Sequence, residues 1–213
     1  MPLDPLDRLR NRLLMLYTIE RASGRGPLSG KVKLLKLLYE AEREMVSERV
    51  RGLTYEFYKW QYGPLSDEAL SDFEWLLSNG LVYYNQEPWE IGFSARGEEV
   101  LKECAPLLRE NKEVLGFIDK VVNRFLLYTG AQIREEVYDQ YIPGDTRRVR
   151  EAEMGETLLR PIEPDQASRI IRIDEEWEET LAILMSMRSK KALEESGEDV
   201  KRGRIRGYVP LSA

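Results

Sequence analysis

The stretch from Phe57 to Val82 constrains the fold of this chain more than any other part of the sequence. It begins with alternating aromatic residues, which favour a β-strand, and then reaches Gly63-Pro64, a pair that interrupts regular structure. Ser66 stands where a helix N-cap is expected, and Gly80 stands where a left-handed residue commonly ends a helix. The stretch therefore predicts a strand, a turn and then a helix that ends before Gly80.

The sequence on either side of this stretch is mostly helical. Asp4-Pro5 predicts a helix that runs to about Ala22, and a second helix from Ser29 places Val32 on its apolar face and lysines on its polar face. We expect further elements as follows: a hairpin over 81–93, a helix from Ser94 to about Ala105, a helix from Asn111 to Gly130 and a helix from Gln132 to Tyr141. A helix followed by a hairpin is the order found in winged-helix domains.

The character of the chain changes after Gly144. Residues 145–168 have little hydrophobic periodicity and contain two prolines, which favours a linker or extended arm. Residues 169–173 alternate like a single strand, and Asp174 caps a helix that extends to Leu193. We therefore predict a mainly α fold with a small β-hairpin (α+β). A winged-helix-like domain (1–144) is joined by the linker (145–168) to a C-terminal arm (169–213).

The composition narrows the function classes. The formal net charge of −6 argues against binding nucleic acid through an overall basic surface. The absence of histidine excludes Ser-His and Cys-His nucleophile pairs and His-containing metal sites. The single cysteine, Cys104, suits a reducing cytoplasm, and no apolar run approaches the ~20 residues that span a bilayer. We expect a cytoplasmic protein with no membrane partner and no cofactor.

Enzymatic interpretations find little support in the residues. Cys104 is typical of a small buried hydrophobe, because no basic residue is fixed beside it in the sequence. Gly30-Lys31 does not match a phosphate-binding loop, since Arg25 and Val32 replace the required glycine and hydroxyl residue. A carboxylate-bound metal stays as an alternative, although no spacing of acids singles out a site.

The aromatic strand has two faces with different expected environments. Alternation places Tyr55 and Phe57 on one face and Tyr58, Trp60 and Tyr62 on the other. We expect most of these rings to fill the core, as aromatic residues in a half-buried strand commonly do. The alternative is a stacking platform for nucleic-acid bases.

DNA recognition is the alternative function. A winged helix would place the helix after Ser66 in the major groove, where bases and phosphates favour Arg, Lys, Asn and Gln. The polar face expected for that helix instead carries Asp67 and Glu74. DNA contact would then depend on basic clusters elsewhere, each of which equally fits a solvated helix face. The candidates for nucleic-acid contact are Lys31, Lys33, Lys36, Arg147, Arg148 and Arg150, together with Arg8, Arg10 and Arg12.

Two resemblances add to these expectations. Residues 29–141 contain Lys33-Leu-Leu-Lys-Leu-Leu-Tyr39, then Phe57-Tyr-Lys-Trp-Gln-Tyr-Gly-Pro64 and Ile91-Gly-Phe-Ser-Ala-Arg-Gly97. In this order the segments resemble the Panacea-domain and YwgA-like proteins, a family linked with phage-associated genes and with the antitoxins of toxin-antitoxin pairs. The resemblance implies no enzymatic activity. The motif residues are Lys33, Lys36, Tyr39, Tyr58, Trp60, Tyr62, Gly63 and Pro64.

The second resemblance concerns the C-terminal arm. From Ile173 to Ile205 the chain is similar to the toxin-neutralising tails of RelB-like and Phd-like antitoxins, with Ile205 in place of the usual valine. This implies a non-enzymatic, antitoxin-like protein that neutralises a partner toxin through its arm, with a winged-helix DNA-binding regulator as the alternative. A homo-oligomer is a further expectation. The expected partner-binding residues are Trp177, Leu181, Leu184 and Met185, as apolar anchors, and Arg202, Arg204 and Arg206, as partners of anions.

Overall fold

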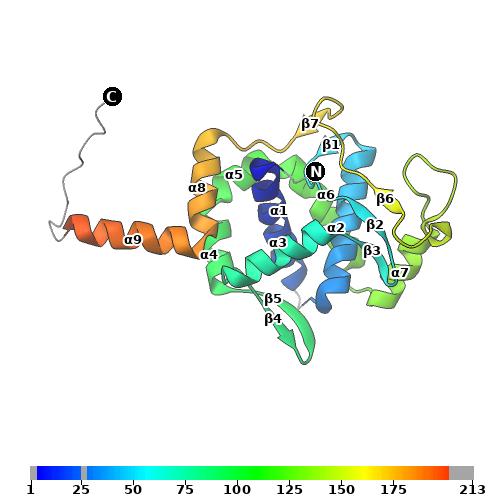
Figure 1. Cartoon of the computed structure of the whole chain (residues 1–213), viewed down its shortest axis with the longest axis horizontal. Helices are drawn as coiled ribbons and strands as arrows, with labels where there is room; N and C mark the ends of the chain where they lie inside the picture. The colour runs from blue at the N-terminus through cyan, green and yellow to red at the C-terminus, as the bar shows by residue number, and fades with distance from the viewer. Residues whose placement is uncertain (1–3, 25–27, 202–213) are drawn as a thin grey trace.

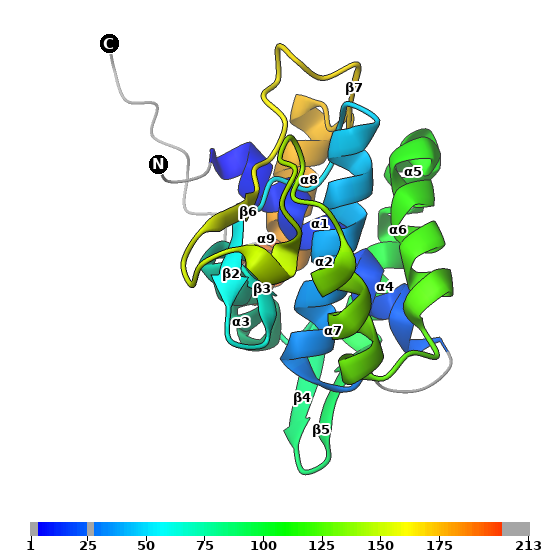
Figure 2. The same ribbon diagram turned by 90° about the vertical axis from the view of Figure 1, so that its right-hand side faces the viewer.

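Two long helices form the centre of the fold in the computed structural model, which describes residues 4–24 and 28–201. These helices are α1 (Pro5–Ser23) and α2 (Gly30–Ser47), and the other elements surround them (Figures 1 and 2). The Asp4 side chain accepts a hydrogen bond from the Leu6 backbone nitrogen at 3.0 Å, so the predicted capped start of α1 is confirmed. The described residues form nine α-helices and small sheets of two or three strands, a mainly helical α+β fold.

Burial extends around α1 instead of following one stripe. Leu13, Leu14, Met15, Leu16 and Ile19 are all completely buried, although a single inward face at helical spacing would include Leu13 and Leu16 but not Leu14 and Met15. The physical reason is the position of the helix, because α3, β5, α6 and α8 all contact it. Periodicity marks one apolar face, whereas a central helix needs apolar residues on several faces.

The predicted aromatic strand is confirmed as β2 (Phe57–Trp60), but its surroundings differ from the expectation. Gly63-Pro64 does not end regular structure, because both residues belong to β3 (Gly63–Leu65), which pairs antiparallel with β2. Pro64 is tolerated there because β3 is an edge strand. On its other side β2 pairs with β6 (Thr157–Leu159).

The residues expected to form a linker therefore contribute to the sheet. Between 145 and 168 lie η1 (Val149–Glu151) and β6, and Val149 is completely buried. Leu158 and Leu159 are buried as well. The segment is extended, as expected, yet its apolar residues pack against the preceding domain. Four buried residues in a polar stretch, Val149, Leu158, Leu159 and Ile162, give too weak a period to be recognised in the sequence.

The helix and hairpin that follow β3 agree with the sequence. In α3 (Asp67–Ser78), the Ser66 hydroxyl accepts a hydrogen bond from the Ala69 nitrogen at 3.3 Å. Gly80 has φ +67°, which is the left-handed conformation expected after the helix. β4 (Val82–Gln86) and β5 (Trp89–Phe93) form the predicted antiparallel hairpin, which extends from the body in Figure 1.

The middle of the chain has one more helix than expected. α4 (Ala95–Glu103) begins at its predicted Ser94 cap, but α5 (Ala105–Glu110) follows it immediately. α6 (Lys112–Phe125) ends before Gly130, and Gly130 instead begins α7 (Gly130–Asp139). Thr129 and Gln132 form a capping box there, with side-chain to backbone hydrogen bonds in both directions. This reciprocal pair explains why Gly130 starts a helix.

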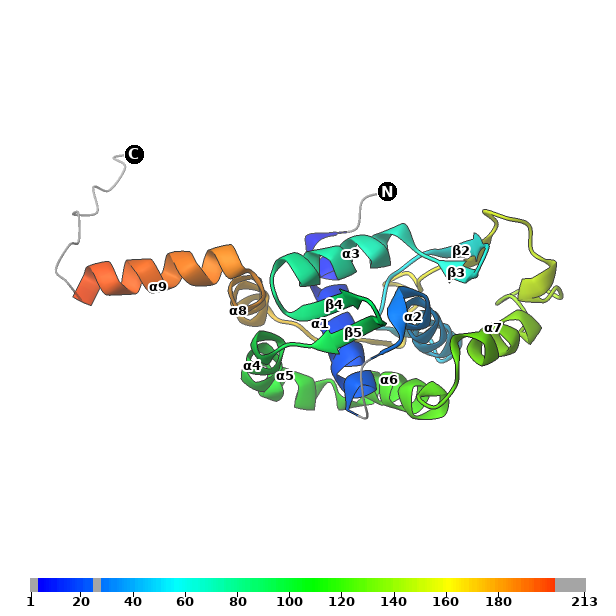
Figure 3. The ribbon, with the colours of Figure 1, turned by 90° about the horizontal axis from the view of Figure 1, so that it is seen from below.

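The C-terminal region divides into a packed part and a projecting part. β7 (Arg169–Ile170) pairs in parallel with β1 (Val50–Arg51), and α8 (Glu175–Met185) then packs against the body. The expectation of one continuous helix to Leu193 is wrong, because the chain turns at Ser186 (φ −88°, ψ 117°). α9 (Met187–Lys201) then leads away from the body (Figures 1 and 3). None of the described helices is long and apolar enough to cross a membrane.

Candidate interaction surfaces

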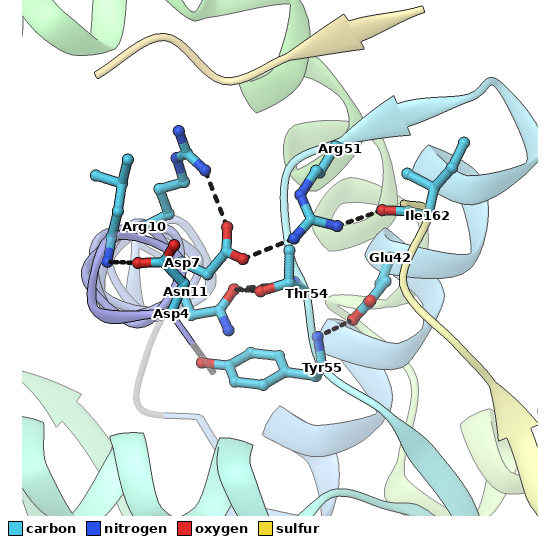
Figure 4. Close-up of polar contacts among 10 residues, drawn as sticks. Asp4, Asp7, Arg10, Asn11, Glu42, Arg51, Thr54, Tyr55 and Ile162 are labelled. Atoms are coloured by element: carbon cyan, nitrogen blue, oxygen red, sulfur yellow. Dashed lines mark hydrogen bonds and ion pairs between the residues drawn. The ribbon is translucent and has the colours of Figure 1, made fainter. Parts of the chain in front are cut away.

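A buried polar network lies at the N-terminal half of α1 (Figure 4). It includes charged residues that the sequence alone would place on the surface. Asp7 accepts from Arg10 Nη1 at 2.9 Å and from Arg51 Nη2 at 2.6 Å. Arg51 also donates to the backbone oxygen of Ile162. The network joins α1, β1 and the segment before β7, so Arg10 is part of the internal framework.

The same network continues toward α2. The Asn11 side-chain oxygen accepts from the Thr54 backbone nitrogen at 2.9 Å, and Glu42 Oε2 accepts from the Tyr55 nitrogen at 3.1 Å (Figure 4). Glu42 is completely buried and its Oε1 has no hydrogen-bond partner. Burial raises the pKa of Glu42 well above its ordinary value, because a charged carboxylate loses its hydration there.

The acidic residues of α3 divide between the inside and the outside of the fold. Asp72 is buried and accepts from Arg12 Nε at 2.8 Å and from the Tyr55 hydroxyl at 3.2 Å. Arg12 also lies 4.0 Å from the centre of the Trp75 ring. Asp67 and other polar residues form the exposed face, as the sequence predicts. That face consists of Asp67, Ser71, Glu74 and Ser78.

Two lysines of α2 that the sequence placed on its polar face are buried in the structure. Lys33 is 7% exposed and Lys36 is 2% exposed, whereas Val32 is 43% exposed. The expected amphipathic arrangement is therefore wrong for this part of the helix. Lys33 Nζ donates to the backbone oxygen of Leu126 at 2.9 Å, and Lys36 Nζ donates to that of Gly130 at 2.9 Å. The two lysines fasten the α6–α7 turn to α2, and their ammonium groups are engaged inside the protein.

Burial changes the acid-base behaviour of both lysines. It lowers the pKa of Lys33, and it lowers that of Lys36 to about 8, with a smaller contribution from the nearby charge of Arg134. Lys36 also lies close to Gly63, where an added Cβ would stand 3.4 Å from Lys36 Cε. The Lys36 and Gly63 segments of the motif therefore meet at the start of α7. This arrangement gives both residues a structural role.

Most of the remaining basic candidates pair with acidic neighbours, whereas Arg8 is exposed. Lys31 pairs with Glu74 on α3. Arg147 pairs with Asp145 at 2.6 Å and with Glu156 at 2.5 Å. Arg148 and Arg150 both pair with Asp139. All three arginines are exposed, but the three acids that they contact offset much of their charge.

The aromatic strand separates as alternation predicts. Tyr39, Tyr55 and Phe57 are completely buried, and Tyr39 and Phe57 meet edge to face with ring centres 5.4 Å apart. Trp60 and Tyr62 are exposed by 46% and 57%. Tyr58 is partly buried, and its hydroxyl donates to Asp67 at 3.0 Å. Tyr62 lies beside a small groove of about 280 Å³, lined by Val32, Lys36, Tyr62, Gly130, Ala131 and Arg134.

The four expected anchors of the arm pack against the chain's own body. Leu181 and Met185 are completely buried, and Trp177 and Leu184 are partly buried against the core. Arg96 Nη2 donates to the Leu184 oxygen at 3.0 Å, which fixes the end of α8 to α4. Residues 169–185 therefore belong to the folded body. The expected anion partners Arg202, Arg204 and Arg206 lie outside the described residues.

α9 is the exposed element that sequence reasoning missed. Its first turn joins the body, because the Met187 nitrogen donates to Asn79 Oδ1 at 3.0 Å and Lys190 pairs with Glu99 at 2.9 Å. Residues 191–198 are all exposed, and Leu193 is 60% exposed. Ser186 is the residue from which the start of a separate helix could have been predicted, because serine is a favoured N-cap. Its hydroxyl accepts a hydrogen bond from the Ser189 nitrogen at 3.2 Å.

The candidate nucleophile Cys104 does not reach the surface. Cys104 is completely buried, and burial raises the pKa of its thiol to about 12. Among residues 4–24 and 28–201, no group of three or more Cys, Asp and Glu side chains is placed to hold a metal ion. The projecting α9 and the exposed aromatic end of β2–β3 are the candidate interaction surfaces nearest to the residues that the sequence singled out.

Comparison of the chain with protein-family models, curated proteins and solved structures finds no match.

Proposed function

We propose that this chain is a non-enzymatic regulatory binding protein of the antitoxin type, which engages a partner protein through the C-terminal segment that begins at Met187. The observation that carries the proposal is the projection of α9 from the body, with residues 191–198 all exposed (Figure 3). The similarity of the chain end to antitoxin tails gives the proposal its specific class.

The energetics of a lone helix support a binding role. Isolated helices shorter than about 12–15 residues are marginal in water, and most helical stability in proteins comes from packing. α9 has 15 residues, contains Gly197 and has little packing beyond its first turn. A glycine inside a helix costs roughly 0.5–1 kcal/mol relative to alanine. A partner that covers α9 would therefore stabilise it.

The proposal changes the residues to which the sequence assigned partner binding. Leu181 and Met185 cannot reach a partner without opening the core, because both are completely buried. Exposed side chains after the α8–α9 turn replace them, among them Met187 and Leu193. Arg202, Arg204 and Arg206 keep their proposed role as partners of toxin or nucleic-acid anions, on sequence grounds.

We also propose that α2, α3 and the β4–β5 hairpin form a winged-helix-like arrangement, but DNA regulation receives less support. The exposed face of α3 is acidic and polar. Lys33 and Lys36 are buried, and Arg147, Arg148 and Arg150 contact acids. Phosphate attraction is the main source of DNA affinity, so basic candidates that are buried or paired with acids are expected to contribute little to it.

The test compares the full chain with a chain that ends at Lys190. The shorter chain keeps the contact of Met187 with Asn79 and the Lys190–Glu99 pair, so its body should melt at the same temperature as that of the full chain. Each protein is used to capture partners from the native host, with and without nuclease. A small protein retained at equal stoichiometry by the full chain alone is then expressed by itself and together with the full chain.

The expected result is growth arrest by the captured protein and rescue by the full chain but not by the shorter one. The full chain with Arg202, Arg204 and Arg206 replaced by serine serves as a second comparison, and rescue should be weakened. Equal rescue by the shorter chain would contradict the assignment to the segment after Lys190. Nuclease-sensitive, steeply salt-dependent capture of DNA alone would favour the regulator.

A further inference from the structure

One segment of the chain, residues 126–151, is attached to the body through three buried ammonium groups. It contains α7 and η1, and we call it the α7–η1 segment. Two of the lysines are on α2 and the third is on β2, and each donates a hydrogen bond to a backbone oxygen of the segment. The pairs are Lys33 with Leu126 at 2.9 Å, Lys36 with Gly130 at 2.9 Å and Lys59 with Val149 at 3.0 Å. These bonds fix both the beginning and the end of the segment.

The partners of these ammonium groups are neutral. Lys33, Lys36 and Lys59 are 7%, 2% and 8% exposed, and in the part of the chain that the structure describes no carboxylate pairs with them. The charged side chains that act on them are cations, since Arg134 of α7 faces Lys36 and Arg150 of η1 faces Lys59. A buried charge without a counter-charge is costly even when it is hydrogen-bonded. The three bonds therefore position the segment precisely but add little to its stability.

The apolar attachment of the segment is also small. α7 lies at the periphery of the molecule, against the outer side of α2 (Figures 2 and 3). Ile133 and Val137 are its buried residues, and the ring centre of Tyr138 lies 3.7 Å from Lys59 Nζ. By contrast, α6 buries six apolar side chains. Elements with few buried apolar contacts are the ones that open locally while the rest of a protein stays folded.

We propose that the α7–η1 segment is a strap that opens locally at neutral pH, because opening returns the ammonium groups of Lys33, Lys36 and Lys59 to water. Opening uncovers the side of α2 that carries Lys33 and Lys36. The inference goes beyond the proposed partner binding and does not depend on it, since it concerns a different part of the purified chain.

The acid-base behaviour of the lysines links this opening to pH. Burial lowers the pKa of all three, and with the charge of Arg134 it lowers that of Lys36 from 10.5 to about 8. Between these two pH values the open form binds more protons than the closed form, so opening becomes less favourable as the pH rises. For Lys36 alone, the ratio of open to closed molecules should fall about ten-fold from pH 7 to pH 9.

Other titratable groups lie near the same lysines. Tyr62 lines the groove beside Lys36, and Tyr138 covers Lys59. Burial raises the pKa of Tyr138 from 10.0, so its titration lies above this pH range. Glu40 on α2 acts in the opposite direction, because burial raises its pKa from 4.5 and its charged form favours opening. Comparing the native chain with lysine variants at the same pH cancels these contributions.

Hydrogen exchange of the backbone amides measures the opening. At pH 7, after correction for intrinsic exchange rates, the amides of α7 should exchange at least ten-fold faster than those of residues 13–19 in the centre of α1. Low concentrations of urea should accelerate exchange in α1 but change it little in α7, because a local opening exposes little surface. From pH 7 to pH 9 the corrected exchange of α7 should slow by about ten-fold or more.

Lysine variants show whether the buried ammonium groups cause the pH dependence. Lys36→Met should remove about ten-fold of the change in α7 exchange between pH 7 and pH 9. Lys59→Met should also reduce that change, because the pKa of Lys59 is lowered too. Lys191→Met is the matched control, since the Lys191 side chain is 75% exposed, and it should keep the full change.

Two outcomes would overturn the proposal. If the α7 amides of the native chain exchange as slowly as those of α1, with the same dependence on urea, the segment opens only when the whole protein unfolds. If the change with pH is the same in the native chain, Lys36→Met and Lys59→Met, the ammonium groups do not drive opening. Failure to capture a partner from the host would leave both measurements unchanged.

Discussion

Replacing Lys36 by methionine tests whether the ammonium group of this residue is held away from water. Lys36 is 2% exposed, and its Nζ donates to the Gly130 oxygen at 2.9 Å. Burial, aided by the charge of Arg134, lowers its pKa from 10.5 to about 8. Methionine keeps much of the apolar stem and removes the charge.

The expected effect is a change in pH dependence. The fall of the Lys36 pKa by about two and a half units corresponds to about 3 kcal/mol of cost for keeping the group charged in the folded protein. Between pH 8 and pH 10.5 the unfolded chain binds this proton and the folded chain does not, so the free energy of unfolding rises with pH. From about pH 7 to about pH 11 the native protein should gain about 3 kcal/mol relative to the Lys36→Met variant.

The assay is urea unfolding of both proteins at a series of pH values. Comparing the two proteins at each pH cancels the titration of other groups, and the lost hydrogen bond to Gly130 adds only a constant offset. Lys191→Met is the matched control, because the Lys191 side chain is 75% exposed. Its difference from the native protein should stay constant with pH.

A constant difference for Lys36→Met as well would refute the reasoning. It would mean that the ammonium group reaches water in the folded protein. Lys36 would then return as a candidate for contact with nucleic acid.

Three further predictions concern buried positions. Burial raises the pKa of Glu42, so the charged carboxylate destabilises the folded protein near neutral pH. Glu42→Gln should therefore raise the free energy of unfolding at about pH 8 by about 1–3 kcal/mol. Chemical unfolding should show that this gain shrinks as the pH falls toward 4.5. A Cβ at Gly97 would overlap the Leu81 oxygen, so Gly97→Ala should cost about 1–3 kcal/mol. In contrast, Gly116→Ala in α6 meets no atom within 4 Å and should gain about 0.5–1 kcal/mol, and thermal melts would show opposite shifts. Cys104 has a thiol pKa raised to about 12 by burial, so a thiol reagent should label it only in denaturant, and rapid labelling of the native protein would contradict its burial.

Local signals in the sequence predicted much of the secondary structure. Asp4, Ser66, Ser94 and Asp174 each cap the helix that they were expected to begin, and Gly80 has the expected positive φ. The acidic exposed face of α3 also followed from helical spacing. These features depend on residues within one turn of each other, so neighbouring sequence is enough to determine them.

The candidate interaction surface was predicted only in part. The sequence directed attention to the C-terminal arm, and α9 projects within it. It also assigned Leu181 and Met185 to a partner, although both fill the chain's own core. An apolar stripe indicates that one face of a helix is buried, but its period is the same whether a partner protein or the rest of the same chain packs against that face.

The sequence by itself determined where most helices begin, how the aromatic residues of β2 divide between two faces, and which chemistry a chain without histidine lacks. Only the tertiary structure decided that Lys33 and Lys36 lie inside, that residues 157–159 complete a sheet with β2, and that the chain turns at Ser186. Each of these depends on atoms far apart in the sequence, such as the Gly130 oxygen that receives the Lys36 ammonium. A charged group can be buried where a hydrogen-bond partner is present, and the position of that partner depends on the whole fold.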